Sequence, residues 1–341
     1  MDYPNIRPDM PPRDVPEAVT GTLAAFFDER AGRVDDIDPE FTRVIGELRS
    51  FTLQGGKRVR PAFAWAGWLG AGGDKGLHSD AEDPAAVFRA VSALEFIQAC
   101  ALIHDDIIDV SATRRGFPTV HKVFEARHRD SGWRGDAAHY GHSVAILAGD
   151  IALAWADDMF HGSGVSDAAR NRAREPWWKM RTEVLGGQLL DITAEASGDD
   201  RIEVAEKVNR YKTAAYTIER PLHIGARLAG AGEDVIEAYR EFGRDIGIAF
   251  QLRDDQLGVF GDPAVTGKPA GDDPVLLDLG ARLAQRRRDI GALQADIAEK
   301  AGVSRSTLHT IEHGGTGVRW EKVAAVAHAL GLAMTFEVTG E

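Results

Sequence analysis

The sequence has few of the features that would point to redox chemistry or to a membrane. Cys100 is the only cysteine among 341 residues, so the chain cannot form an internal disulfide. Its place in an apolar segment favours a small core side chain over a reactive thiol. No apolar run approaches the length of a membrane span, and residues 1–14 are rich in proline and charge instead of basic and then apolar. We therefore expect a soluble, cytoplasmic protein without stable membrane insertion.

An excess of basic charge is also lacking. The chain has 53 Asp and Glu against 40 Lys and Arg, and its net charge of -13 argues against non-specific binding of nucleic acid by the molecule as a whole. The charge is unevenly distributed, because from Val275 onward eight Lys and Arg balance eight Asp and Glu. A neutral tail behind an acidic main part indicates a separate domain.

Alternating strand patterns and internal repeats are missing as well. Up to about residue 272, apolar residues recur at helical spacing, with clusters of Gly, Pro and Asp as breaks. We expect an all-α domain over residues 1–273 and a second domain over residues 274–341, because the segment GDPAVTGKPAGDDP interrupts the pattern and shorter helices follow it. The predicted breaks between helices are residues 70–84, 129–141, 162–167, 197–200, 229–233 and 261–274.

The most informative segment is residues 102–121, LIHDDIIDVSATRRGFPTVH. In a helix, Asp105 and Asp109 share one face and Asp106 lies beside Asp105, which makes a carboxylate cluster suited to hard cations. The alternative is an acidic helix end on a solvated surface. The apolar run over residues 90–103 argues against it, because a mostly buried helix end needs counter-ions for its charges. The pattern predicts a diphosphate held by magnesium.

Basic residues in several motifs could bind phosphate oxygens. Arg114 and Arg115 follow the acidic segment and offer forked donors. In GGKRVRP, paired glycines let backbone amides approach an anion, and Lys57 and Arg60 add full charges. In YKTAAY, Lys212 could reach a phosphate. Each motif alone could be structural, and a helix end with an incidental basic turn would explain GGKRVRP.

Two further segments add carboxylates and an amide. FQLRDD ends another helical segment with Asp254 and Asp255, and GGQLLD carries Gln188 and Asp191 on one helical stretch. A lone pair of aspartates is mostly structural. Two acidic helix ends that face each other, however, could bracket a diphosphate with several magnesium ions.

In their order along the chain, GGKRVRP, HDDIID with RRG, GGQLLD, YKTA, FQLRDD and TGKPAGDD resemble the motifs of the trans-isoprenyl diphosphate synthase (polyprenyl synthetase) family, over roughly residues 15–273. The resemblance implies an all-helical bundle, usually homodimeric, that joins isopentenyl diphosphate to an allylic diphosphate with Mg²⁺. It implies that isopentenyl diphosphate is held by Lys57, Arg60, Gln98 and Arg115. The residues implied around the allylic diphosphate are Arg114, Lys212, Thr213, Gln251 and Lys268.

The same resemblance implies that magnesium is bound by Asp105, Asp106 and Asp109 of the first acidic motif and by Asp254 and Asp255 of the second, with Asp105, Asp109 and Asp254 as the expected metal ligands. Together with Arg114 and Lys212, these aspartates form the implied catalytic set. Gln98 stands where many members have histidine, which exchanges one hydrogen-bonding side chain for another.

The family's chemistry also requires an apolar, water-free tunnel for the growing prenyl chain. Its floor is formed in family members by the residues four and five before the first aspartate motif, which here are the small Ala101 and Cys100. This implies a longer product such as geranylgeranyl diphosphate, although bulk at Ile97 or Leu94 could also stop growth. Family members continue after the GDD motif with further helices that this chain replaces, which implies a C-terminally truncated bundle with a more open cavity and puts activity in question.

The segment from residue 278 to 335 has short helices with a turn between two of them. In a helix-turn-helix arrangement, Ala298 would be the small contact residue, Gly302 would form the turn, and Val303 would be a core residue. Ser304 is a good N-cap for the next helix. The segment resembles the Cro/repressor-type helix-turn-helix family. The resemblance implies a DNA-binding surface formed by Gln294, Ser304, Arg305, Ser306, Thr307 and His309, with Gln294 and Arg305 at phosphates and the others near base edges.

A possible terminal strand over residues 333–338 would suit a dimer, and a two-fold dimer would read palindromic DNA. The alternative for this domain is a small helical module used for dimerisation. For the whole chain, the first hypothesis is a prenyl-elongating enzyme with an appended DNA-binding domain. The others are a transcription regulator whose synthase-like domain senses an isoprenoid diphosphate, and a recombined or misread gene with one poorly folded half.

Overall fold

The computed structural model describes residues 3–199, 201–260, 274–312, 318 and 320–332, without the side chains of residues 251–252, 254–260, 274–278 and 306. These residues are helical almost throughout, and their strands are the pair β1 (Thr113–Arg114) and β2 (Phe117–Pro118). The longer helices are α1 (Val15–Asp35), α2 (Pro39–Leu53), α3 (Val59–Gly70), α4 (Pro84–Ser92), α5 (Leu94–Ile108), α6 (Val120–Asp130), α7 (Ala137–His161), α8 (Asp167–Ser197), α10 (Arg220–Leu228) and α11 (Glu233–Phe260). The shorter elements before residue 260 are η1 (Pro12–Asp14), η2 (Gly73–Lys75), α9 (Ile202–Val208) and the π-helix η3 (Asn209–Glu219). The predicted all-α class is confirmed.

The predicted breaks coincide with the gaps between these helices, and local chemistry explains several of them. The side chain of Asp83 accepts a hydrogen bond from the backbone of Ala85 at the start of α4, and that of Ser166 accepts one at the start of α8. Gly198 ends α8 with a φ of 64°, a conformation that other residues adopt with strain. The last predicted break, residues 261–274, lies almost entirely outside the described residues.

The chain divides into two compact units. The first comprises Met1–Thr113 and Phe117–Gln251, and the second comprises Leu252–Glu341 together with the turn Arg114–Gly116. The domain boundary predicted at residue 273 falls in the range that the structure does not describe, and it stays a prediction.

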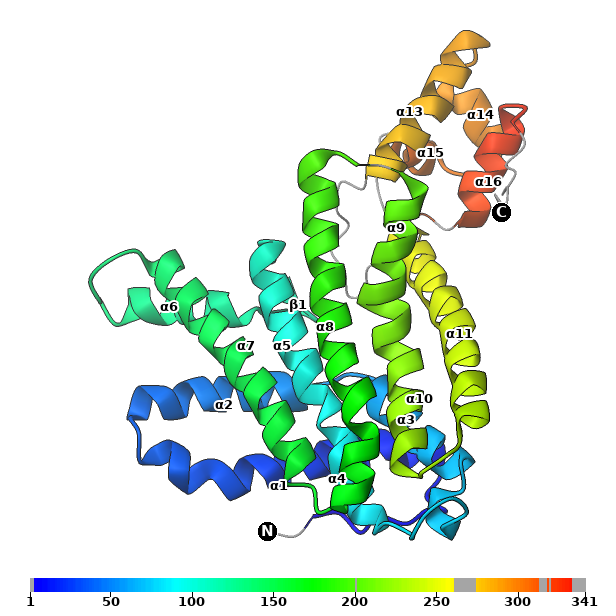
Figure 1. Cartoon of the computed structure of the whole chain (residues 1–341). Coiled ribbons are helices and arrows are strands. Elements are labelled where there is room, and N and C mark those ends of the chain that lie inside the picture. The colour runs from blue at the N-terminus through cyan, green and yellow to red at the C-terminus, as the bar shows by residue number, and fades with distance from the viewer. Residues whose placement is uncertain (1–2, 200, 261–273, 313–317, 319, 333–341) are drawn as a thin grey trace. The chain divides into compact units, whose positions relative to one another are not determined.

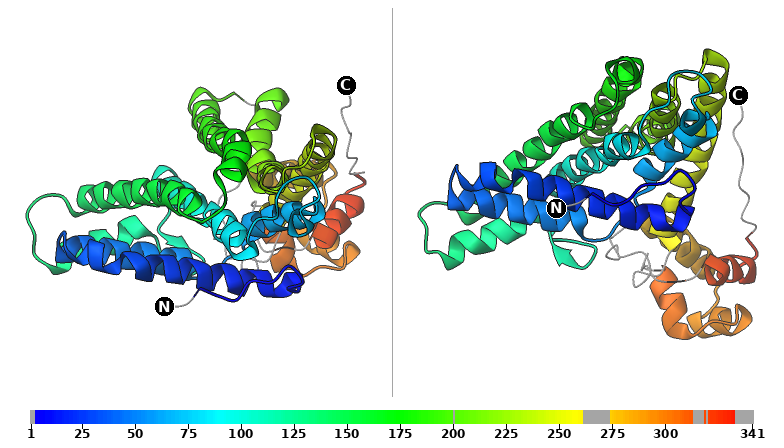
Figure 2. Two further views of the ribbon diagram at one scale, coloured as in Figure 1. Left: turned by 60° about the horizontal axis from the view of Figure 1, so that its bottom comes forward. Right: turned by 90° about the horizontal axis from the view of Figure 1, so that it is seen from below.

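In the first unit, α1 and α2 form a hairpin that lies across the longer helices (Figures 1 and 2). Helix α5 packs on α7, η3 packs on α8, and α10 packs on α3 and α8. The hydrophobic core draws buried residues from α1, α3, α4, α5, α7, α8 and α10, and those of α4 and α5 include the fully buried Phe88, Leu94 and Phe96. The candidate site lies where the C-terminal end of α5 contacts side chains of α8 and η3.

Two glycines allow α3 and α10 to approach each other at backbone distance. A Cβ atom on Gly67 would lie 2.7 Å from the carbonyl oxygen of Leu222, and one on Gly225 would lie 2.0 Å from that of Ala64. No side chain can be accommodated at such distances, so any larger residue would push the helices apart.

The prediction that no apolar run approaches the length of a membrane span is wrong for Pro84–Ile108, which is long and apolar enough to cross a membrane. In the structure, 78% of its most apolar window is buried inside the protein. Burial of this extent is typical of a core helix, because its apolar side chains already contact other helices.

The second unit contains α13 (Pro274–Asp289), α14 (Gln294–Lys300), α15 (Arg305–Glu312) and α16 (Trp320–Ala329). Its core includes Ile297, Ala298, Leu308, Ile311 and Val326. The turn between α14 and α15 contains Gly302 with a φ of 66°, and Ser304 then accepts a hydrogen bond from the backbone of Thr307 at 3.0 Å. The predicted helix, glycine turn and capped second helix are confirmed, whereas the strand predicted over residues 333–338 lies outside the described residues.

Candidate active site

The first acidic motif lies at the C-terminal end of α5. Asp105 and Asp106 are in its last turn, and Asp109 caps the helix immediately after Ile108, with its backbone N–H donating to the carbonyl oxygen of Asp105. Asp106 is only 1% exposed, while the side chain of Asp105 is 21% exposed. The apolar body of the helix thus carries its carboxylates to one end of a largely buried segment, as the sequence predicted.

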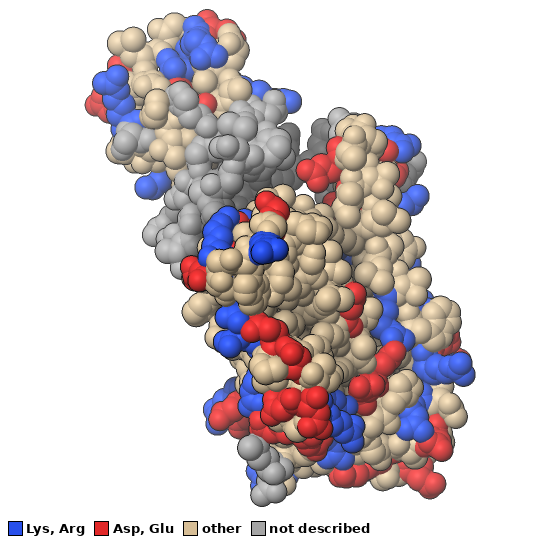
Figure 3. Space-filling model, turned by 90° about the vertical axis from the view of Figure 1, so that its left-hand side faces the viewer, with Lys and Arg blue, Asp and Glu red and all other residues tan. Residues whose placement is uncertain are grey.

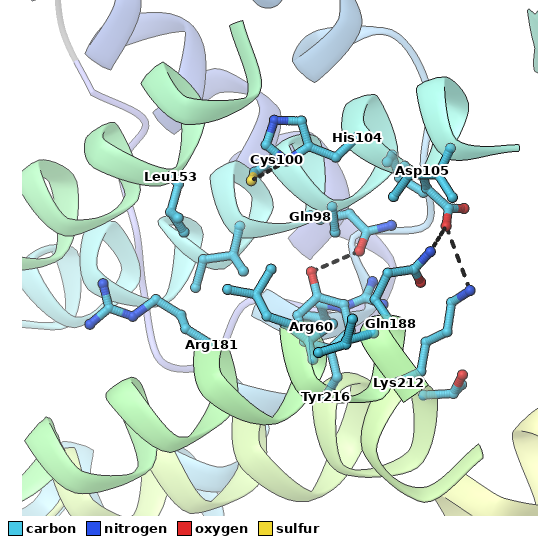
Figure 4. Close-up of a pocket in the computed structure, with 18 of the residues that line it drawn as sticks. Arg60, Gln98, Cys100, His104, Asp105, Leu153, Arg181, Gln188, Lys212 and Tyr216 are labelled. Carbon is cyan, nitrogen blue, oxygen red and sulfur yellow. Dashed lines mark hydrogen bonds and ion pairs between the residues drawn. The ribbon is translucent and has the colours of Figure 1, made fainter. Parts of the chain in front are cut away.

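Asp105 is joined to two residues from other helices. The side-chain amide of Gln188 in α8 donates a hydrogen bond of 2.9 Å to Asp105 Oδ1, and Lys212 Nζ in η3 lies 3.5 Å from the same oxygen. Lys212 also donates to Asp191 of α8 at 2.6 Å. Figure 4 shows Gln188 and Lys212 converging on Asp105. Motifs that are about 80 to 110 positions apart along the chain therefore form one polar cluster.

Lys212 keeps its positive charge in this cluster. Burial by itself lowers the pKa of Lys212, but the hydrogen bond to Asp191 and the charges of Asp105 and Asp109 outweigh it, so the pKa is raised. Lys212 therefore lies among the carboxylates of Asp105, Asp109 and Asp191 as a cation. Such a donor set suits a hard divalent cation better than a second lysine.

The position of Lys212 depends on a π-helix and a glycine. Its segment, η3, is π-helical over Asn209–Glu219, a form that occurs frequently at functional sites. A Cβ atom on Gly187 of α8 would lie 2.7 Å from the backbone nitrogen of Lys212. The glycine of the GGQLLD motif thus permits η3 and α8 to approach closely enough for Lys212 to reach Asp105 and Asp191.

The cluster borders a cavity of about 320 Å³. Its walls come from α5, α7, α8 and η3, and much of its lining is apolar, including Ile97, Leu153, Val184 and Ile192. In Figure 4, Asp105 and Lys212 lie on one side of the cavity, and Leu153 and Arg181 lie on the opposite side. A cavity with a charged end and apolar walls can hold a ligand that has an anionic head and a hydrocarbon tail.

A second group of predicted residues lies along the same cavity. The guanidinium of Arg60 stacks over the ring of Tyr216 at 4.0 Å and donates to the hydroxyl of Thr217 at 3.0 Å. The hydroxyl of Tyr216 donates to the side-chain oxygen of Gln98 at 2.9 Å. With its oxygen bound in this way, Gln98 presents its amide group as a donor. Burial raises the pKa of Tyr216, so its hydroxyl remains a donor.

Arg60 has donor capacity left. Its Nε atom is buried and makes no hydrogen bond to any described residue. A buried donor of this kind is costly unless a ligand or water completes it. Thr213 also lines the cavity, whereas Lys57 is exposed in the loop between α2 and α3 and is not among the residues that line it.

The loop that carries Lys57 is fixed by its neighbour. Arg58, with a left-handed φ of 50°, precedes α3 and is buried. Its NH1 atom lies 2.6 Å from Glu95 Oε2 of α5. Gly55 and Gly56 also have positive φ values, of 70° and 98°. The glycines are needed for this turn, and the ion pair ties it to the helix that carries the aspartates.

The remaining predicted residues are not part of the described cavity. Arg114 and Arg115 lie in the β1–β2 hairpin, and neither lines the cavity. Gln251, Asp254 and Asp255 belong to α11, but their side chains lie outside the described residues, as does Lys268 entirely. Among the side chains that the structure describes, no three His, Cys, Asp or Glu residues form a ready-made metal site.

In the second unit, the predicted DNA-binding residues divide between two helices. Arg305 and His309 are exposed on α15, Thr307 is half-buried, and the side chain of Ser306 lies outside the described residues. The amide of Gln294 in α14 donates to Glu312 at 2.7 Å, and Glu312 also pairs with Arg287. Gln294 is therefore held by a side chain of its own domain in this structure, while Arg305 projects from the start of α15.

Comparison with known proteins finds a matching family for each of the two predicted domains. A family model for polyprenyl synthetase matches residues 43–277. The chain belongs to the polyprenyl synthetase family. It is 35% identical to geranylfarnesyl diphosphate synthase of Aeropyrum pernix over 284 residues, and this alignment covers 80% of each chain. It is also 33% identical over 270 residues to geranylgeranyl diphosphate synthase of Mycobacterium tuberculosis, which covers 76% of this chain and 69% of the relative.

A solved structure extends the likeness. The geranylgeranyl pyrophosphate synthase of Corynebacterium glutamicum, complexed with isoprenyl diphosphate and magnesium, is 47% identical with a TM-score of 0.75, and covers 94% of this chain and 87% of that one. A second family model, for a helix-turn-helix domain, matches residues 278–335. The chain thus combines a polyprenyl synthetase domain with a helix-turn-helix domain.

Three residues at this site of a polyprenyl synthetase were not singled out from the sequence. They are Tyr216, His104 and Arg181, all of which line the cavity. His104 lies beside the acidic motif, and its Nε2 atom is 3.1 Å from the carbonyl oxygen of Ile146. Tyr216 follows Lys212 by four positions in YKTAAY, and this spacing was the available signal for it.

Proposed function

We propose that the chain catalyses magnesium-dependent, head-to-tail transfer of an allylic prenyl group to isopentenyl diphosphate, giving geranylgeranyl diphosphate or a product of similar length. The observation that carries this proposal is the cavity of α5, α7, α8 and η3, which has Asp105, Gln188 and Lys212 at one end and apolar walls beyond them. Membership in the polyprenyl synthetase family and similarity to prenyl diphosphate synthases support the same reaction.

Magnesium fits the donor set at the end of α5. Asp105 and Asp109 would hold it, with Asp254 from the second acidic motif and with Asp106 and Asp255 beside them. Bound there, the ion would neutralise charge on the departing diphosphate. The carboxylate oxygens gathered at this helix end support the assignment, because hard divalent cations prefer oxygen ligands.

Two sets of donors would hold the two diphosphates. Lys212 and Thr213, which line the cavity beside Asp105, would bind the allylic diphosphate, with Arg114, Gln251 and Lys268. Arg60 and Gln98 would bind isopentenyl diphosphate, with Lys57 and Arg115. The buried Nε donor of Arg60 and the amide of Gln98 support the second set, since both groups are available as donors.

The apolar walls would protect the reaction from water. When the diphosphate departs, positive charge develops on the allylic carbon, and the double bond of isopentenyl diphosphate attacks it. The condensed cation then loses a proton to the departed diphosphate, which restores a double bond. Ile97, Val184 and Ile192 would exclude water from this carbon, since water would otherwise capture it. Lys212 and the other basic residues stabilise the negative charge that leaves.

The test is incubation of the full chain with magnesium, labelled isopentenyl diphosphate and farnesyl diphosphate, followed by chromatography of the lipid products. We expect a longer labelled chain, and a loss of about 100-fold or more in Asp105→Ala. Asp80→Ala, which removes an exposed carboxylate far along the chain from the motif, is the control and should retain activity. A folded wild-type protein that forms no product would overturn the proposal.

We propose in addition that the protein is a homodimer. Helix α7 exposes Ile146 by 46% and Leu147 by 59%, so it offers apolar side chains that a second copy of the chain would cover. Figure 3 shows uncharged surface beside groups of acidic and basic side chains on one face. Light scattering should report a dimer, and Leu147→Arg should shift it toward the monomer.

For the helix-turn-helix domain we propose binding of palindromic DNA through Arg305, Ser306, Thr307 and His309 of α15, with Ser304 at its cap and Gln294 from α14. The exposed polar start of α15 supports this. Selection from a random DNA pool with the full chain should enrich one palindrome. Arg305→Ala should weaken its binding and lower the salt dependence by about one unit of slope, unlike Lys322→Ala on α16.

The alternative, in which the first domain only senses an isoprenoid diphosphate, is not better supported than the enzyme. It would be favoured if ligand changed DNA affinity while no product formed. A cytoplasmic location remains a prediction.

A further inference from the structure

We propose that Arg181, held by Asp157, closes the deep end of the prenyl cavity and limits the length of the chain that the protein accepts. The proposal rests on the proposed function and adds a specificity determinant to it. Arg181 lies in α8 and Asp157 in α7, and their side chains are 2.5 Å apart.

The small residues of α5 do not end the cavity. Ala101, Cys100 and Ile97 all line it, but so do Leu153 of α7 and Arg181 of α8. Figure 4 places Leu153 and Arg181 on the side away from Asp105, so a prenyl tail whose diphosphate lies near Asp105 would extend toward them. The barrier therefore lies beyond Cys100 and Ala101.

Arg181 is held firmly in this position. Asp157 accepts hydrogen bonds from Arg181 and, at 2.6 Å, from the indole of Trp177. The Trp177 ring stacks on Phe160 with centroids 4.2 Å apart, and the guanidinium of Arg181 lies 5.5 Å from the Trp177 ring. The Arg181 side chain is 23% exposed. Movement of this side chain would break an ion pair, and contact with an apolar tail would strip water from its charge.

Space exists on the other side of Arg181. A second cavity of about 520 Å³ is lined by the aromatic rings of Phe160, Trp177 and Trp178 and by the polar side chains of His161, Arg170, Asn171, Arg174 and Arg181. Arg181 is the described residue that lines both cavities. Removal of its side chain would join them, and the aromatic rings beyond it would offer apolar surface to a longer chain.

The experiment compares the wild type with Arg181→Ala in two measurements. The first is equilibrium binding of farnesyl, geranylgeranyl, geranylfarnesyl and hexaprenyl diphosphates with magnesium, which needs no turnover. The second is the length of the products formed. We expect the wild-type affinity to fall beyond the preferred length, and Arg181→Ala to bind the next longer diphosphate about tenfold tighter than the wild type, equal to about 1.4 kcal/mol, with longer products.

Arg174→Ala is the matched control, because Arg174 lies two turns away on the same helix and lines only the second cavity. It should leave the length profile unchanged. Should Arg181→Ala fold poorly because Asp157 is left without its partner, Arg181→Ala with Asp157→Asn removes that charge and is tested in the same way. An unchanged binding profile in a folded variant overturns the inference. Absence of product with a shifted binding profile would reject the proposed function alone.

Discussion

Tyr216→Phe should impair binding of isopentenyl diphosphate more than binding of the allylic substrate. The substitution removes one hydroxyl, which is buried and donates to Gln98 at 2.9 Å, and keeps the ring that stacks under Arg60 at 4.0 Å. Without this donor, the side-chain oxygen of Gln98 is left without its partner, and the amide can rotate away from the diphosphate. Loss of such a buried partner costs about 1–3 kcal/mol.

The expected change in KM for isopentenyl diphosphate follows from the part of this free-energy cost that weakens substrate binding. If about 1.4 kcal/mol is expressed at the site, the KM for isopentenyl diphosphate rises about tenfold. The kcat and the KM for farnesyl diphosphate should change less than about threefold, because Lys212 and Asp105 are untouched. Since burial raises the pKa of Tyr216, the difference between variant and wild type should not depend on pH around neutrality.

Initial rates at varied concentrations of each substrate provide the measurement. Tyr211→Phe is a suitable control, because Tyr211 lies at the start of the same motif and is not among the residues that line the cavity. Equal effects on both substrates, or no change in the KM for isopentenyl diphosphate, would show that Tyr216 does not orient Gln98. Restoration by Gln98→Ala in the Tyr216→Phe background would also contradict the reasoning.

Two further predictions concern stability. Glu95→Ala leaves Arg58 buried without its ion-pair partner, so it should lower the free energy of unfolding, measured in urea, by about 3–5 kcal/mol. The control Glu206→Ala removes an exposed carboxylate and should change the free energy of unfolding by less than about 0.5 kcal/mol. Equal effects of the two substitutions would refute the role of the ion pair. Burial, with the charge of Arg220 nearby, lowers the pKa of His223 from 6.5 to about 3. The folded state therefore disfavours protonated His223, and stability is complete above about pH 6.5 and is lost as the pH falls toward 3. Between pH 7 and pH 5 the expected loss is about 2 kcal/mol, and a His223→Gln variant with the same pH dependence would exclude His223 as its source.

The helical fold was predictable because its signals are local. The side chains of Asp83 and Ser166 accept hydrogen bonds from backbone groups no more than three residues later, and Gly198 supplies a left-handed residue at a helix end. Each of these helix boundaries therefore depends on residues that are close together in the sequence. The approach of Asp105 to Lys212 was predictable for a different reason. The number of residues between them matches no helical or strand repeat, so their contact could be predicted only from the resemblance of the motif order to that of a known family.

Contacts between helices that are distant along the chain could not be predicted from the sequence. Gln98 looked like a simple exchange for histidine, and its bond to Tyr216, 118 positions away, gives that exchange a structural partner. The pair of Arg181 with Asp157 connects α7 to α8 at a separation of 24 residues, which matches no helical or strand period. Either residue read alone would be assigned to a solvated helix face.

The π-helical form of η3 makes deletions more harmful to this protein than substitutions. A π-helix turns by less per residue than the roughly 100° of an α-helix, because its hydrogen bonds reach one residue further. If a deletion in Asn209–Glu219 let the segment wind as an α-helix, the angle between side chains inside it would change. Lys212 and Tyr216 face one cavity because the segment has its present length. A lineage that shortened η3 outside YKTAAY would therefore turn Lys212 and Tyr216 relative to each other, although every residue of the motifs would be unchanged.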